Sequence, residues 1–209
     1  MGKLKLLCLH GYRQTGESFR EKTGAFRKFM KKHCEFEFLT APNVIMDNGG
    51  CAWWFSHSDR YFKAKDESDC DTGFQESLDA VKTFLKTKGP FDGILAFSQG
   101  AAFALLLHLL LEQNLCELGG FRPRFSILIA PFRSRSSNHI HLYAGTISLP
   151  TLVVYGETDE VIPLEMTKDI LPIFVPPATV YSHEGGHFIP TNPDAKRAYE
   201  QFLLKFITN

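Results

Sequence analysis

Three polar side chains that lie far apart in the sequence have the types that nucleophilic catalysis needs. Ser98 lies in "ILAFSQGAAFAL", Asp159 in "LVVYGETDEVIP" and His187 in "SHEGGHFIP". A serine hydroxyl becomes a strong nucleophile only when a histidine accepts its proton, and that histidine needs an acid that fixes its tautomer and stabilises its charged form. The three residues therefore predict acyl transfer, with Ser98 as nucleophile, His187 as general base and Asp159 as orienting acid.

The residues around Ser98 predict a sharp turn between a strand and a helix. The short apolar run 93–97 is typical of a buried strand, and segment 99–113, which is apolar on nearly every face, is typical of a buried helix. Such a nucleophile elbow needs small residues two positions before and after the serine, because strand and helix pass close together. Gly100 meets this requirement, whereas Ala96 stands where the G-x-S-x-G pattern has glycine.

Other residues compete for the acid and base roles. The order serine, acid, histidine along the chain is that of α/β-hydrolases and favours Asp159 with His187. An aspartate that only caps a helix would look the same as Asp159. His183 is the rival base, but Gly185 and Gly186 give His187 the freedom to reach back. Three further carboxylates lie near Asp159 in the sequence: Glu157, Glu160 and Asp169.

The glycine-containing stretch "LCLHGYRQTGES" follows an early strand and can supply half of an oxyanion hole. A tetrahedral intermediate needs backbone N–H donors from the residue after the serine, here Gln99, and from such a loop, here Tyr12. Gly11 lets the loop turn without a side chain in the way. The same stretch has the glycine spacing of a P-loop, but Glu17 occupies the lysine position and would repel a phosphate. An oxyanion loop is therefore the preferred interpretation.

The aromatic residues Trp53, Trp54 and Phe55 in "GGCAWWF" are the candidate substrate-binding residues. They lie in segment 40–70, whose prolines, glycines and charges without periodicity predict a long loop or lid. Wide apolar rings beside an elbow can line an acyl-chain channel. They can equally form a hydrophobic plug that holds the loop down, and the sequence leaves both interpretations open. Met46 and Cys51 share this ambiguity.

The remaining histidines and the first cysteine do not predict a second reactive centre. His108 lies on the apolar helix and is expected to be a core histidine, and Cys8 in the first strand is expected to behave as a small hydrophobe. His10, at the end of that strand, is expected to shape the oxyanion loop through hydrogen bonds. His139 and His141 fit no ligand spacing, so no metal site is proposed.

Strand-like and helix-like patterns alternate along the chain. A helix is expected to begin at a capping box formed by Thr72 and Gln75 and to end near Lys88. The other helix-like segments are 18–32, 99–113 and 194–207, and the strand-like segments are 3–9, 35–39, 93–97, 125–130, 151–155 and 179–182. Continuous apolar strands are buried on both faces, so the pattern predicts an α/β fold with a mainly parallel sheet of about six strands and helices on both faces.

Composition limits the class of protein. The chain has 209 residues, enough for the single domain expected over 1–209, and its 23 basic and 23 acidic residues give no electrostatic footprint for nucleic acid. The longest apolar stretch, 101–111, is far short of the ~20 residues of a membrane span, so no stable membrane insertion is expected. Without a signal-peptide pattern, and with an odd count of five cysteines and no CxxC pair, the sequence predicts reduced thiols and a cytoplasmic location.

Five motifs together resemble the FSH family of serine hydrolases over nearly the whole chain: "LCLHGYRQ", "GGCAWWF", "FDGILAFSQGA", "PTLVVYGETDEVIP" and "EGGHFIP". The resemblance implies an α/β-hydrolase core without a large cap, serine esterase or thioesterase activity on carboxylic esters, and no cofactor. Ser98, Asp159 and His187 match the family's triad. The chain departs from the family at Ala96 and at "APFRSR" (130–135), where relatives tend to carry serine-glycine before the phenylalanine. The second departure bears on the shape of the pocket floor.

The expected function is therefore that of a serine hydrolase that cleaves carboxylic esters, long-chain acyl esters among them, through an acyl-enzyme. Its partner is a small-molecule acyl ester. An acyl-protein or acyl thioesterase with the same triad is the alternative within enzymes. A hydrolase-fold protein that binds a ligand without turnover is the alternative of another class. The sequence carries no signal for the oligomeric state.

Overall fold

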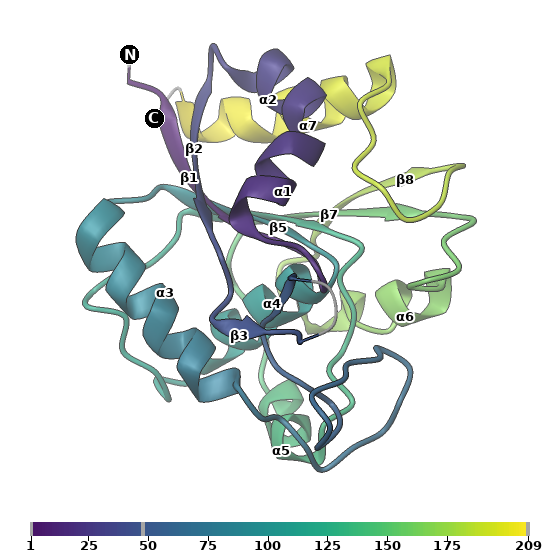
Figure 1. The fold of residues 1–209 in the computed structure, drawn as a ribbon. Helices are drawn as coiled ribbons and strands as arrows, with labels where there is room; N and C mark the ends of the chain where they lie inside the picture. Colours follow the sequence, from purple (N-terminus) through teal and green to yellow (C-terminus); the bar gives the residue numbers. More distant parts are fainter. Residues whose placement is uncertain (1, 47–48, 208–209) are drawn as a thin grey trace.

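A parallel sheet forms the centre of the protein (Figure 1). The computed structural model describes residues 2–46 and 49–207. Its six-stranded sheet has the order β2-β1-β5-β6-β7-β8, and every neighbouring pair is parallel, which confirms the α/β prediction. The strands are β1 (Leu4–Leu9), β2 (Cys34–Leu39), β5 (Gly93–Phe97), β6 (Phe125–Ile129), β7 (Thr151–Gly156) and β8 (Thr179–His183).

Helices cover both faces of the sheet. Figure 1 shows α1 (Gly16–Lys22), α2 (Gly24–Met30) and α7 (Pro193–Ile207) on one face, with α3 (Phe74–Lys88) and α4 (Gln99–Glu112) on the other. Shorter helical segments are α5 (Ser137–Ile140), α6 (Leu164–Lys168) and the 3-10 turns His141–Ala144 and Leu171–Ile173. Along 2–46 and 49–207, no helix has the length and apolar character that crossing a membrane requires.

The strand order creates a switch point between β1 and β5. The chain begins in β1, adds β2 on the outside, and returns to the other side of β1 as β5. The helices that follow β1 and β5 therefore leave to opposite faces of the sheet. In open parallel sheets, ligands bind at the carboxyl ends of the strands at such a point. The loop of Tyr12 follows β1, and Ser98 follows β5.

The long segment 40–70 is ordered by short backbone pairings. Strands β3 (Asn43–Val44) and β4 (Cys51–Ala52) form an antiparallel pair, and Cys51 also bridges to Gln14. Further along, the N–H of Ser68 donates to Arg135 O at 3.2 Å and the N–H of Ser137 donates to Ser68 O at 2.8 Å. The predicted loop is thus joined both to the segment after β1 and to the segment after β6.

The prediction of one helix over 18–32 is wrong, because two helices meet at Thr23. The first begins earlier than predicted, since the Thr15 Oγ1 accepts the N–H of Ser18 and the Ser18 Oγ accepts the N–H of Thr15 in a capping box. At Thr23 the backbone leaves helical geometry (φ −85°, ψ 9°), and its hydroxyl donates to Phe19 O at 2.8 Å. A threonine hydroxyl that binds the preceding turn in this way bends a helix.

The predicted capping box at Thr72 and Gln75 is also wrong. Helix α3 begins at Phe74, and its N-cap Gly73 has a φ of +90° with no side-chain cap. The Asn43 Nδ2 donates to Gly73 O at 2.9 Å, and a Cβ on Gly73 would lie 2.4 Å from the Asn43 Oδ1. A residue thirty positions away therefore fixes the helix start, which a local pattern cannot reveal.

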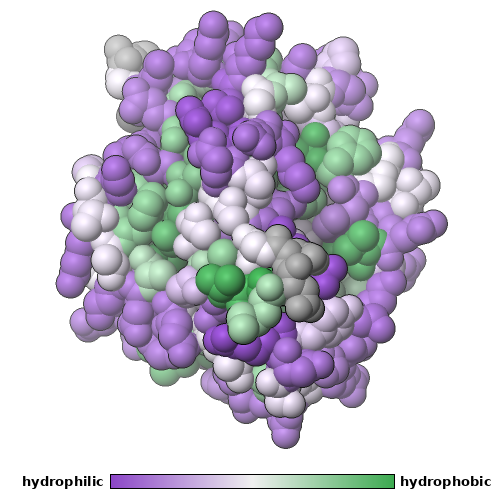
Figure 2. Space-filling model, viewed as in Figure 1, coloured by the Kyte–Doolittle hydropathy of each residue, from purple (hydrophilic) through white to green (hydrophobic). Residues whose placement is uncertain are grey.

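The face of the protein drawn in Figure 2 is mainly hydrophilic. On the face drawn in Figure 2, apolar side chains gather in small separate groups among polar residues. Val44 on β3 and the nearby Met46 are among the exposed apolar residues, at 53% and 83%. Apolar side chains scattered in this way are ordinary for globular proteins.

Three histidines are almost fully buried inside the protein. His10, His108 and His139 are each 2% exposed or less, and burial lowers the pKa of each to about 4. The His108 Nε2 lies 2.7 Å from the Ser126 Oγ inside the core, which confirms the prediction of a core histidine. All three side chains are neutral at pH 7 in the folded protein.

These histidines should make folding sensitive to acid. Their pKa is lower in the folded chain than the ~6.5 of an unfolded one, so unfolding takes up protons between about pH 6.5 and pH 4, and stability falls as the pH decreases through that window. We expect a loss of roughly 1–2 kcal/mol per histidine between pH 7 and pH 5. Urea denaturation at the two pH values measures it.

His108→Gln provides the control, because glutamine keeps a partner for the Ser126 hydroxyl and cannot take up a proton. Between pH 7 and pH 5 the variant should lose less free energy of unfolding than the wild type, and the difference should equal the roughly 1–2 kcal/mol expected for one histidine. An unchanged difference between the two pH values would contradict the assignment.

Candidate active site

The structure brings Ser98, His187 and Asp159 together at one edge of the sheet. The His187 Nε2 lies 2.9 Å from the Ser98 Oγ, and its Nδ1 lies 2.7 Å from the Asp159 Oδ2. The three residues follow β5, β8 and β7, and the carboxyl ends of these parallel strands lie at the same edge. The result is a hydroxyl, an imidazole and a carboxylate in one hydrogen-bonded line, the arrangement that activates a serine.

Ser98 occupies a strained turn between β5 and α4. Its φ of 54° and ψ of −120° are unusual for a residue with a side chain. A Cβ on Gly100 would lie 2.4 Å from His10 O, so only glycine lets α4 pass the end of β1 at this distance. Ala96 is fully buried within β5. The elbow therefore forms with alanine at its front position, where the family pattern has glycine.

Asp159 is held in place by its own loop. Its Oδ1 accepts the N–H groups of Val161 at 2.9 Å and Ile162 at 2.8 Å, which leaves the Oδ2 for His187. The carboxylate side chain is 1% exposed. The rival carboxylates make other contacts: Glu157 accepts from the Ser182 hydroxyl, and Asp169 accepts from the Arg133 guanidinium. The structure thus brings Asp159, and neither of these two, to the imidazole.

His183 and His187 have different surroundings. The His183 Nδ1 accepts the N–H of Gly185 at 3.2 Å, and partial burial lowers the pKa of its ring. A Cβ on Gly156 would lie 2.2 Å from Gly185 O, so β7 and the histidine loop pass in close contact. The ring of His187 lies against Phe97, with centroids 4.7 Å apart. The loop after β8 thus brings His187, and not His183, to Ser98.

The two predicted oxyanion donors lie on segments that contact Ser98. Gln99 is the first residue of α4, where N–H groups have no acceptor within the helix. A Cβ on Gly11 would lie 3.3 Å from the Ser98 Cβ, so the loop of Tyr12 runs directly beside Ser98. Within residues 2–46 and 49–207 the N–H of Tyr12 has no protein acceptor, whereas the N–H of Arg13 donates to Cys51 O at 3.1 Å.

His10 shapes the oxyanion loop through hydrogen bonds, as the sequence predicts. Its Nε2 accepts the N–H of Ala41 at 2.9 Å, so the hydrogen is on Nδ1, which donates to Gly11 O at 2.8 Å. With both nitrogens engaged and a pKa near 4, this ring is poorly suited to act as a base. Full burial raises the pKa of the Cys8 thiol well above its usual range, which disfavours a thiolate nucleophile.

The aromatic candidates lie beneath the surface. Trp53, Trp54 and Phe55 are each 1% exposed or less. The Trp53 indole stacks on Phe103 of α4 at 4.8 Å, and the Trp54 ring packs edge-on against Phe62 at 5.1 Å. In this conformation the rings anchor the loop, as the plug interpretation describes.

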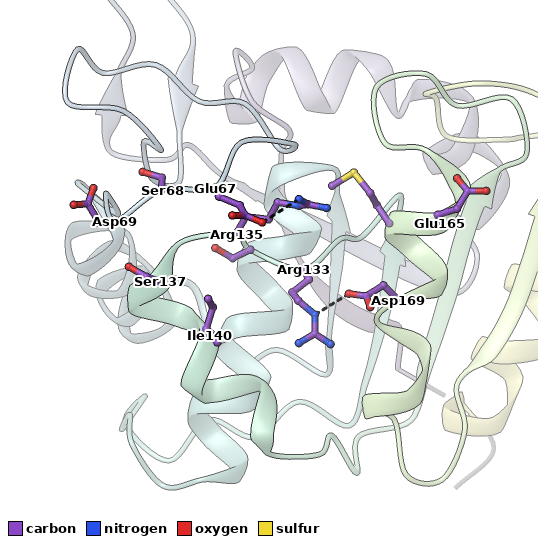
Figure 3. A pocket seen from close by; sticks show the side chains of 11 residues that line it. Glu67, Ser68, Asp69, Arg133, Arg135, Ser137, Ile140, Glu165 and Asp169 are labelled. Carbon is purple, nitrogen blue, oxygen red and sulfur yellow. Dashed lines mark hydrogen bonds and ion pairs between the residues drawn. The ribbon is translucent and has the colours of Figure 1, made fainter.

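A charged cavity of about 810 Å³ lies beside the loop after β6. In Figure 3, Arg133 is directed toward Asp169 and Arg135 toward Glu67, with nitrogen–oxygen distances of 2.8 and 3.8 Å. Both arginines belong to the segment "APFRSR" (130–135), which departs from the family pattern. The sequence related this segment to the shape of a pocket floor, but neither arginine was among the predicted site residues.

A parallel α/β sheet with a nucleophile elbow and a serine–histidine–carboxylate line at its carboxyl edge defines an α/β-hydrolase. The chain belongs to the serine hydrolase family FSH1, whose family model matches residues 1–199. Within the family, its motifs resemble those of the ovarian-cancer-associated gene 2 proteins. The relatives below agree with that placement.

Curated relatives match almost the whole chain. Esterase OVCA2 of Danio rerio is 44% identical over 224 residues, which cover 97% of this chain and 97% of the relative. Esterase CG5412 of Drosophila melanogaster is 42% identical over 96% of this chain and 74% of its own. Esterase OVCA2 of Mus musculus is 38% identical over 97% of this chain and 96% of its own.

Solved structures share the fold at low sequence identity. Esterase PE8 superposes with a TM-score of 0.69 at 20% identity, covering 99% of this chain and 93% of its own. Acyl-protein thioesterase 2 of Zea mays superposes with a TM-score of 0.67 at 17% identity, covering 97% of this chain and 95% of its own. These likenesses confirm the α/β-hydrolase fold without a large cap.

Gly100→Ala should destabilise the protein, because the new Cβ would lie 2.4 Å from a backbone oxygen that cannot move aside. We expect a loss of about 1–3 kcal/mol in the free energy of unfolding, measured by urea denaturation. Gly24→Ala is the matched control, since no atom lies within 4 Å of its added Cβ on α2. Alanine there should be neutral or stabilising by up to about 1 kcal/mol. Equal stability of the two variants would contradict the close passage at Gly100.

Proposed function

We propose that this chain is a serine esterase that cleaves carboxylic esters through an acyl-enzyme. The hydrogen-bonded line of Ser98, His187 and Asp159 in a strained elbow carries the proposal. Membership of a serine hydrolase family supports it, as do relatives that are named esterases.

The reaction follows from the positions of these groups. The Ser98 Oγ attacks the carbonyl carbon of the ester while its proton passes to the His187 Nε2, and Asp159 stabilises the imidazolium. The oxyanion accepts hydrogen bonds from the backbone N–H groups of Gln99 and Tyr12. Collapse of the tetrahedral intermediate breaks the carbon–oxygen bond, and the alcohol leaves with the proton from His187. Water then attacks the carbonyl carbon of the acyl–serine ester while its proton passes to His187. The bond from that carbon to the Ser98 Oγ breaks, His187 returns the proton to the Oγ, and the acid is released.

The same steps would cleave a thioester, since only the leaving atom changes. Acyl-protein or acyl thioesterase activity therefore stays the alternative, and a matched oxygen ester and thioester of one acyl group distinguish the two. Long-chain acyl esters and an aromatic channel stay predictions, and the channel would need the buried rings of Trp53, Trp54 and Phe55 to reach the surface. A ligand-binding protein without turnover is disfavoured by the hydrogen bond between Ser98 and His187.

Ser98→Ala should abolish esterase activity, because it removes the nucleophile. We expect the turnover of a p-nitrophenyl ester to fall by ~10⁴-fold or more and labelling by a fluorophosphonate probe to disappear. Ser126→Ala is the control, since the Ser126 Oγ also lies 2.7 Å from a histidine nitrogen but inside the core. Per folded molecule it should keep its activity and labelling. Retention of most activity in Ser98→Ala would reject the proposed function.

The two histidines allow a second test of the site. His187→Ala should lower kcat by ~10⁴-fold, because the serine loses its base. In His183→Asn the amide oxygen can still accept the N–H of Gly185, so kcat should stay within about threefold of wild type. Steady-state kinetics of both variants measure this, and a larger loss in His183→Asn than in His187→Ala would reverse the assignment.

A further inference from the structure

The two oxyanion donors come from segments that are distant in the sequence and must be held at a fixed separation. Tyr12 belongs to the loop after β1, and Gln99 belongs to the turn after β5. Two donors stabilise one oxygen only when both N–H groups point at it from about 3 Å, and displacement of either weakens the transition state. A group that is bonded to both segments would therefore control this geometry.

Trp53 is bonded to both segments from behind. Its indole Nε1–H donates to His10 O at 2.7 Å, two residues before Tyr12. Its backbone N–H donates to the Gln99 Oε1 at 3.0 Å, and the Gln99 Nε2 donates to Trp54 O at 2.7 Å. The side chain of Gln99 thus holds the aromatic segment, and its backbone N–H is the proposed oxyanion donor.

The Trp53 indole packs against the rings of Phe103 and His10. It stacks on Phe103 at 4.8 Å with an interplanar angle of 14°, and its centroid lies 5.1 Å from the ring of His10. Trp53 and His10 are both fully buried, so water cannot replace a lost hydrogen bond without entering the core. The bond to His10 O is therefore expected to be maintained throughout the catalytic cycle.

The position of His10 O is transmitted to the N–H of Tyr12 through two peptide planes. Trp53 fixes the carbonyl of the plane between His10 and Gly11, and the His10 Nδ1 fixes the carbonyl of the plane between Gly11 and Tyr12. In a trans peptide the C=O and N–H point in opposite directions. The N–H of Tyr12 is thereby directed away from the imidazole of His10.

From these contacts we propose that Trp53 is a positioning residue that sets the separation and direction of the two oxyanion donors. The inference rests on the proposed function, since it assigns Gln99 and Tyr12 as donors. It differs from both earlier interpretations of the aromatic segment. A channel wall would change KM with the length of the acyl chain, and a plug would change stability alone.

Trp53→Phe tests the inference, because phenylalanine keeps a ring on Phe103 and loses the N–H that reaches His10 O. We expect kcat for a short p-nitrophenyl ester to fall by about 10- to 100-fold with KM within about threefold of wild type. A trifluoromethyl ketone forms a tetrahedral adduct whose oxygen needs the same donors. Its inhibition constant should rise by the same factor as kcat falls.

Phe26→Leu is the matched control for lost ring packing, since Phe26 on α2 is also buried and packs on Tyr199 with ring centroids 4.9 Å apart, without contact to the proposed site residues in the described part of the chain. It should lose similar stability in urea while kcat and the inhibition constant change by less than about threefold. Equal losses of kcat in the two variants, or a change in KM alone in Trp53→Phe, would overturn the inference.

Gln99→Met serves as a second variant if Trp53→Phe does not fold. Methionine has nearly the length of glutamine and keeps the backbone N–H, but it loses both bonds to the aromatic segment. It should shift kcat and the inhibition constant in the same direction as Trp53→Phe, and unchanged values would overturn the inference. Failure of the proposed function itself is distinguishable, because Ser98→Ala would then stay active whatever Trp53→Phe does.

Discussion

The close passage of α4 against the end of β1 is the constraint on which the site depends. At Gly100 the two backbones are so near that no side chain fits between them. This contact places the start of α4 beside the loop of Gly11 and Tyr12, directly after Ser98 with its strained φ of 54°. The proposed nucleophile and both proposed oxyanion donors therefore lie on backbone segments that one close contact holds together. Donors held rigidly in this way can stabilise a developing charge without reorganisation.

The parallel sheet supplies the rest of the geometry. Because β5, β7 and β8 run in the same direction, the loops that carry Ser98, Asp159 and His187 leave the sheet at one edge. Asp159 shows how a partner limits orientation there, since one carboxylate oxygen accepts hydrogen bonds from backbone N–H groups and the other from the imidazole. Buried polar groups satisfied in this way tend to adopt a single arrangement.

Segment 40–70 illustrates why sequence reasoning has a limit. Its irregular composition predicts a long loop or lid, whereas the structure also contains the short strands β3 and β4 within it. The contacts between this segment and the elbow are invisible in the sequence. The bonds from Trp53 to His10 and Gln99 join residues more than forty positions apart. The start of α3 at Gly73 depends on a distant residue too, since Asn43 of that segment bonds to the Gly73 carbonyl and occupies the space that a Cβ there would need.

The sequence by itself determined the class of sheet, the elbow and the order of the candidate site residues. Each strand, the elbow and each short motif can be recognised from a few neighbouring positions. A buried strand followed by Ser98, a small residue and an apolar helix is a local signal of this kind. Only the tertiary structure decided that His187 and not His183 meets the serine, and that the arginines of "APFRSR" line a charged cavity. These outcomes depend on how loops from separate strands pack against one another, and packing between distant segments is an energy that no single stretch of sequence contains.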